Sequence, residues 1–63
     1  MTGRIKSYNA RQGYGFIVAD GQDYRFKTNN VEMRLPPCEG MKVTFDPYKS
    51  EKGMRAANVR DDG

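Results

Sequence analysis

Turn-forming residues divide this chain into short pieces, and no stretch keeps a 3.6-residue period. Between the turns, apolar and polar residues alternate with a period of two, as in half-buried strands. Strands are expected at residues 4–8, 14–19, 24–27, 41–46 and 54–60. The expected connections are a turn at 9–13, a hairpin turn at 20–23, a long loop at 28–40 and a polar loop at 48–53. Pro47 is expected to end the fourth strand, and the whole pattern predicts an all-β protein.

The chain is too short for more than one small unit, so residues 1–63 are expected to form a single domain. Cys38 is the only cysteine and there is no histidine, which excludes an intramolecular disulfide and a zinc site. Neither a metal nor a cofactor is expected. Five short strands without a disulfide or a metal site favour an antiparallel five-stranded barrel of the OB type. Closure of such a barrel hides most sheet edges.

The net charge of +3 is unevenly distributed. Residues 1–31 hold five basic and two acidic side chains, whereas residues 32–63 hold six of each. All of the net positive charge therefore lies in the N-terminal half, which indicates a polyanionic partner such as nucleic acid.

The most informative segment is residues 12–18, with the sequence QGYGFIV. In a strand, Tyr14 and Phe16 share one face, while the two glycines and Ile17 share the other. Glycines weaken a strand, so their presence indicates close backbone approach or sharp barrel curvature. The two rings are then expected on the outer face, where paired aromatics form a platform for stacking bases.

Alternation also assigns faces in the first and last strands. Ile5 is expected on one side of the first strand, with Arg4, Lys6 and Tyr8 on the other. In the last strand, Ala57 and Val59 are expected to point inward.

These motifs occur in an order and at a spacing that resemble the bacterial cold-shock proteins over nearly the whole chain. The matching pieces share identity with the family pattern and lie at residues 3–6, 8–9, 13–17, 20–21, 39–45, 52–53 and 56–59. The resemblance implies a five-stranded OB barrel that binds single-stranded RNA or DNA and melts RNA secondary structure without ATP.

We expect bases to stack on three aromatic side chains and the phosphates to meet four basic ones. The aromatic set is Tyr8, Tyr14 and Phe16, and the basic set is Lys6, Arg11, Arg25 and Lys27. Binding is expected to depend only weakly on the base sequence of the nucleic acid.

The chain departs from the family pattern on the binding side. Ser7 stands where the family usually has Trp, and Gln12 stands in place of a usual Lys, with Arg11 beside it. The loop at 28–40 is about two residues shorter than the corresponding loop of the family, and it lacks the exposed Phe that is typical there. We therefore expect weaker binding than a full aromatic set provides.

The third strand allows two registers. In the first, Tyr24 and Phe26 face outward and Arg25 points into the core, where an unpaired charge costs several kcal/mol. In the second, Tyr24 and Phe26 face inward and Arg25 and Lys27 face outward. The second register is favoured, and it replaces aromatic stacking at this point with contacts from cations.

A divergent barrel whose outer face binds protein, or a second copy of itself through the long loop, is the alternative function. The chain is expected to be a monomer or a weak homodimer. An enzyme is not expected, because no nucleophile and base are paired in the sequence. No apolar segment approaches a membrane span and no signal peptide precedes the first strand, so a cytoplasmic location is expected.

Overall fold

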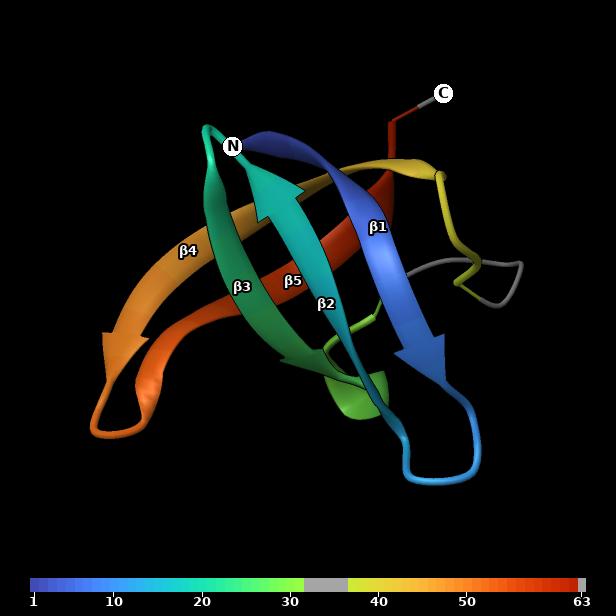
Figure 1. Cartoon of the computed structure of the whole chain (residues 1–63), viewed down its shortest axis with the longest axis horizontal. Coiled ribbons are helices and arrows are strands. Elements are labelled where there is room, and N and C mark those ends of the chain that lie inside the picture. Colours follow the sequence, from blue (N-terminus) through green and yellow to red (C-terminus); the bar gives the residue numbers. More distant parts are fainter. Residues whose placement is uncertain (32–36, 63) are drawn as a thin grey trace.

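The computed structural model describes residues 1–31 and 37–62 and forms a closed barrel with strand order β1-β2-β3-β5-β4 (Figure 1). The elements are the strands β1 (Thr2–Asn9), β2 (Tyr14–Ala19), β3 (Gln22–Lys27), β4 (Lys42–Ser50) and β5 (Gly53–Asp61), and a 3₁₀ turn η1 (Thr28–Asn30). Neighbouring strands are antiparallel except β3 and β5, which run parallel. The predicted all-β, five-stranded OB barrel is confirmed.

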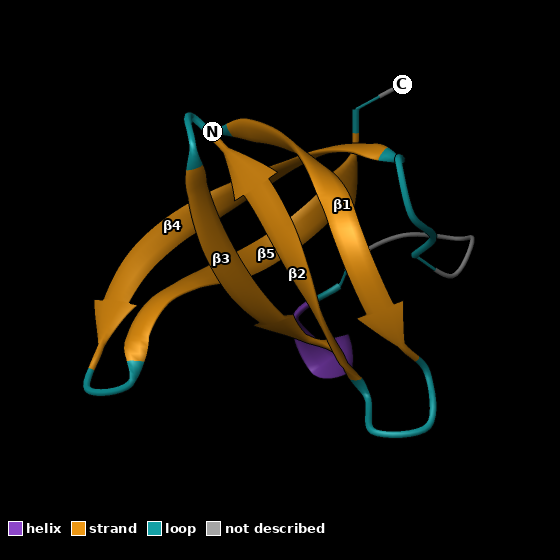
Figure 2. Ribbon diagram, viewed as in Figure 1, coloured by secondary structure: helices purple, strands orange, loops and turns teal. Residues whose placement is uncertain are grey.

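The barrel presents β1, β2 and β3 side by side as one curved sheet, with the β4–β5 hairpin crossing behind it (Figure 2). The inward side chains of both parts make one apolar core, in which Tyr24 and Phe45 pack with ring centroids 5.0 Å apart. The buried residues are Ile5, Ile17, Ala19, Tyr24, Phe26, Val43, Phe45, Ala56 and Val59. The outward side chains of β1, β2 and β3 are thus left available to a partner.

The β2–β3 connection is a tight hairpin. Asp20 and Gly21 both have positive φ, 51° and 74°, as a two-residue type I′ turn requires. Gln22 and Asp23, which the sequence placed in the turn, are already strand residues. The shorter turn extends the paired face of β2 and β3 by two positions.

β4 continues through Pro47 to Ser50, so the prediction that Pro47 ends this strand is wrong. Pro47 pairs with Ala56 of β5, while the pairing of β4 with β1 covers only Lys42 to Thr44. This part of β4 is therefore an edge, where a residue without an N–H group is tolerated.

β5 contains an irregularity that changes which alanine is buried. Ala56 and Val59 are fully buried, whereas Ala57 is only half-buried, so the expected inward position of Ala57 is wrong. Asn58 has a φ of 52°, and the register with β4 shifts at this point. The extra residue of this bulge breaks the two-residue alternation.

Within the part of the chain that the structure describes, there is no helix long and apolar enough to cross a membrane.

Candidate nucleic-acid interface

The outer face of β2 and β3 carries alternating aromatic and basic side chains. Phe16 pairs directly with Arg25, and Tyr14 pairs directly with Lys27. Directly paired residues of neighbouring strands point to the same face, so the four side chains form a compact cluster. The predicted outward position of Tyr14 and Phe16 is confirmed, since Gly15 and Ile17 between and beyond them are buried.

The register of β3 is the second of the two alternatives. Tyr24 and Phe26 keep only 6% and 1% of their surface exposed, whereas Arg25 is half-buried and Lys27 is exposed. The inward places thus go to the two rings, and no charge enters the core. Two cations face outward beside two aromatic rings.

Gly13 and Gly15, on either side of Tyr14, are required for different structural reasons. Gly13 adopts a φ of 72° at the end of the β1–β2 turn. Gly15 has extended backbone, but a Cβ atom there would lie 2.7 Å from Cζ of Phe26 and 2.5 Å from the Ser7 carbonyl oxygen. The Phe26 ring therefore fills the space beneath Gly15, which agrees with the close approach expected from the sequence.

Arg25 is positioned by an aromatic ring. Its guanidinium carbon lies 4.8 Å from the centroid of the Tyr14 ring, within cation–π range. Tyr14 in turn meets Phe16 edge to face, with centroids 6.1 Å apart and planes at 86°. The Arg25 Nε atom is buried and has no hydrogen-bond partner among the described residues. The ring contact thus orients this guanidinium without a hydrogen bond to Nε.

Tyr8 does not lie on the outer face, so its predicted side is wrong. The register between β1 and β2 shifts between Ile5 and Ser7, which places Ser7 opposite Phe16 and Tyr8 opposite the buried Gly15. The Tyr8 ring stacks on the core ring of Phe26, with centroids 6.0 Å apart and planes within 3°. The bulge at Lys6 reverses the alternation. Tyr8 is half-buried and lies at the rim of the core, beside the aromatic cluster.

The Tyr8 hydroxyl connects β1 to the start of η1, directly after β3. It forms a hydrogen bond of 3.2 Å with Thr28 Oγ1. The backbone N–H of Thr28 donates to the Gly13 carbonyl oxygen at 2.8 Å. These contacts hold the β1–β2 turn against η1 at the edge of the face.

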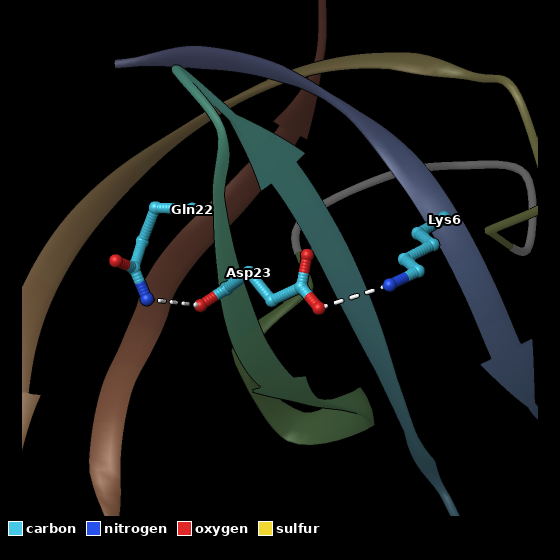
Figure 3. Close-up of polar contacts among 3 residues, drawn as sticks. All are labelled: Lys6, Gln22 and Asp23. Carbon is cyan, nitrogen blue, oxygen red and sulfur yellow. Dashed lines mark hydrogen bonds and ion pairs between the residues drawn. The ribbon is translucent and has the colours of Figure 1, made fainter.

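Lys6 and Asp23 form an ion pair that spans β2. Lys6 Nζ lies 3.0 Å from Asp23 Oδ2, and Figure 3 shows the two side chains reaching toward each other from β1 and β3. The side chains remain 58% and 47% exposed, so the pair is open to solvent and screened by salt. Gln22 Nε2 also donates to the Asp23 carbonyl oxygen at 3.2 Å. The expected phosphate contact of Lys6 has an acidic competitor that the sequence analysis did not identify.

The remaining predicted basic residue, Arg11, lies exposed in the β1–β2 turn next to Gln12. The Gln12 backbone N–H donates to Asn9 Oδ1 at 3.2 Å, and Gly13 N–H donates to the Asn9 carbonyl oxygen at 2.8 Å. The turn is thus ordered by Asn9, and Arg11 projects from it.

The structure brings four predicted residues together and leaves three at the edges. Tyr14, Phe16, Arg25 and Lys27 share the β2–β3 face; Lys6 and Tyr8 lie on β1, and Arg11 lies in the turn. The missed residue is Asp23, whose signal in the sequence was its place on the same face as Phe16 and Arg25 once the hairpin turn is shortened. The loop at 28–40, in which the family's exposed Phe is missing, falls partly outside the described residues. Cys38 is exposed with a free thiol, and the described residues contain no cluster of three or more metal-ligating side chains.

A closed five-stranded barrel with an aromatic and basic outer face is the architecture of small nucleic-acid-binding proteins. A model of the 'Cold-shock' DNA-binding domain family matches residues 1–61. The chain belongs to this family, and thus to a class of nucleic-acid-binding proteins.

Individual relatives align over almost their full length. Cold shock protein 1 of Lactiplantibacillus plantarum is 43% identical over 60 residues, covering 90% of this chain and 91% of the relative. Cold shock-like protein CspA of Vibrio cholerae is 40% identical over 63 residues, with coverage of 94% and 90%. Cold shock-like protein CspG of Shewanella violacea is 37% identical over 62 residues, with coverage of 92% and 89%.

Proposed function

We propose that residues 1–63 act as one domain that binds single-stranded RNA or DNA and destabilises RNA secondary structure without ATP. The observation that carries the proposal is the cluster in which Tyr14 and Phe16 pair with Lys27 and Arg25 across β2 and β3. Rings and cations alternate there at the spacing of neighbouring strands, about 4.8 Å.

The rings supply contact with bases and the cations supply contact with phosphates. Every base has a π-face, so stacking on Tyr14 and Phe16 tolerates any sequence and contributes ~1–3 kcal/mol per base. Lys27 and Arg25 neutralise phosphates and release counterions, so affinity falls as salt rises. Arg25 also offers its guanidinium plane for stacking.

Destabilisation of RNA structure follows from this selectivity for unpaired strands. A stacked base on Phe16 is unavailable for pairing in a duplex, so binding shifts the equilibrium toward the open strand. The shift is limited to the difference in affinity between single and double strands, and it needs no energy source.

The basic residues at the edges extend this contact. We propose that Lys6, once displaced from Asp23, and the exposed Arg11 of the turn also contact phosphates. Tyr8 is half-buried and stacks on the inward Phe26 ring, so it offers a base less surface than an outward ring does. Ser7 opposite Phe16 contributes no ring, so affinity is lower than that of a face with a third aromatic.

The proposal includes a cytoplasmic location and a monomeric or weakly dimeric state. The exposed thiol of Cys38 suits a reducing compartment.

A titration with a short oligopyrimidine at low salt tests the proposal. Tyrosine emission reports binding, because the chain has four tyrosines and no tryptophan. We expect binding that weakens steeply with salt and that Phe16→Ala lowers by fivefold or more. Absence of binding at low salt overturns the proposal. If unfolding midpoints then rise with protein concentration, the face serves self-association instead.

A further inference from the structure

The β2–β3 cluster continues around the barrel onto β5 and β4. Arg25 pairs with Arg55 across the parallel β3–β5 contact, and Arg55 pairs with Tyr48 across the β5–β4 hairpin. Together with the Phe16–Arg25 pair, these registers place four side chains in one row on the outer surface. The row spans three strand spacings, roughly 14 Å from Phe16 to Tyr48.

Tyr48 is the most exposed large apolar side chain of the described residues. It keeps 43% of its surface exposed, although Phe45 on the same strand is almost completely buried. None of the ring contacts found within the described part of the chain involves Tyr48. Its ring is therefore free to stack on a ligand.

Arg55 is held in place between the two ends of the row. Its Nε donates to Ser50 Oγ at 3.0 Å, and Ser50 Oγ donates to the Gly53 carbonyl oxygen at 2.8 Å. The hairpin thus fixes the stem of this half-buried side chain beside Tyr48.

The hairpin that carries Tyr48 is basic. In its distal part, residues 48–55, Lys49, Lys52 and Arg55 are present against Glu51 as the one acidic side chain. Lys49 and Lys52 are exposed. An anionic chain leaving the β3 face therefore meets positive charge rather than repulsion along this path.

We propose that Tyr48 and Arg55 form an additional subsite, at which the same single-stranded nucleic acid continues from Arg25 onto the β4–β5 hairpin. A base stacks on Tyr48, and Arg55 contacts the adjacent phosphate. This inference rests on the proposed function, because the strand reaches the hairpin only by crossing the β2–β3 face.

The edge of β4 at this position favours a nucleic acid over an added protein strand. A partner strand would need a continuous ladder of hydrogen bonds, and Pro47, next to Tyr48, has no N–H to donate. Exposed aromatic and basic side chains need no such ladder to bind a nucleotide.

The test compares a tetranucleotide and a decanucleotide of deoxythymidine, each labelled with a fluorophore, by anisotropy at low salt. The tetranucleotide matches the smallest site sizes of OB folds, and the decanucleotide is long enough to reach the hairpin. Tyr48→Ala is expected to weaken binding of the decanucleotide about fivefold and to leave the tetranucleotide unaffected. Tyr48→Phe keeps the ring and is expected to bind like the original chain. Thermal melting verifies that both variants remain folded.

Phe16→Ala separates this inference from the proposed function. If Phe16→Ala weakens both oligonucleotides and Tyr48→Ala weakens neither, the hairpin subsite is wrong and the proposed function stands. An equal loss on both lengths with Tyr48→Ala also overturns the subsite, since an extension acts only on the longer strand. If the original chain binds neither oligonucleotide, both proposals fall.

Discussion

The Arg25 guanidinium carbon lies 4.8 Å from the centroid of the Tyr14 ring, so the cation and the ring of the β2–β3 face are already layered before any ligand arrives. A base that approaches this point meets a guanidinium group that already lies over the Tyr14 ring. Part of the entropy of ordering a long side chain is thus lost on folding rather than on binding.

Replacing Arg25 with Ala is therefore expected to lower affinity for single strands about fivefold to tenfold. The slope of log affinity against log salt should become less steep by about 0.7, the value for one phosphate contact on a single strand. The free energy of unfolding should fall by no more than about 1 kcal/mol, because the lost contact is a half-exposed cation–π pair. Anisotropy titrations at several salt concentrations and a urea melt measure the three quantities.

Lys42→Ala is the matched control for loss of one positive charge. Lys42 already pairs with Asp62 at 3.4 Å, on a different part of the barrel. An unchanged salt slope in Arg25→Ala, or an equal change in Lys42→Ala, would show that Arg25 makes no phosphate contact of its own.

Ser7→Trp is expected to strengthen binding about fivefold. Ser7 lies directly opposite Phe16, so an indole there extends the aromatic cluster onto β1 and adds a stacking surface of ~1 kcal/mol or more. Ser7→Leu controls for added apolar surface without a ring. Both variants are titrated with the same oligopyrimidine. If Ser7→Leu raises affinity as much as Ser7→Trp, stacking is not the cause of the gain.

Much of the fold could be predicted from alternation and turn chemistry. The faces of Tyr14 and Phe16, and the inward rings of β3, follow from burying apolar side chains while keeping Arg25 out of the core. The outward cluster was therefore predictable before its distances were known.

The errors about which face a side chain takes occur where a backbone irregularity changes the alternation. The bulges at Lys6 and Asn58 turn Tyr8 inward and bury Ala56 in place of Ala57. Asn tolerates the positive φ found at Asn58, but a single Asn does not specify a bulge. The positions of these bulges depend on closure of the barrel, since strands that pair on both sides must bend. The Lys6–Asp23 pair was missed for a related reason: it depends on the register of three strands at once.

Asp23→Asn is expected to raise affinity two- to threefold at low salt. The change frees Lys6 from a pair that is worth at most about 1 kcal/mol at this exposure, and it removes a negative charge from the face. The gain should shrink as salt is raised, because exposed charges are screened. Anisotropy titrations at two salt concentrations measure it.

A double-mutant cycle identifies the cause of that gain. In a Lys6→Gln background, Asp23→Asn should raise affinity less, because there is no longer a lysine to release. The same gain in both backgrounds would mean that Asp23 acts by repelling the strand directly and not through Lys6.

Gly15→Ala is expected to destabilise the barrel by about 1–3 kcal/mol, because a Cβ atom cannot fit between the Phe26 ring and the Ser7 carbonyl oxygen without moving one of them. In a domain of this size the melting temperature should fall by roughly 4–8 °C for each kcal/mol. Gly21→Asn is the matched control: its φ is 74°, which Asn tolerates, and an added Cβ would meet nothing within 4 Å. Thermal melts followed by circular dichroism should leave this control within about 0.5 kcal/mol of the original chain. Equal melting temperatures for the two variants would show that the barrel accommodates a Cβ atom at position 15, and that Gly15 is not required to leave room for Phe26.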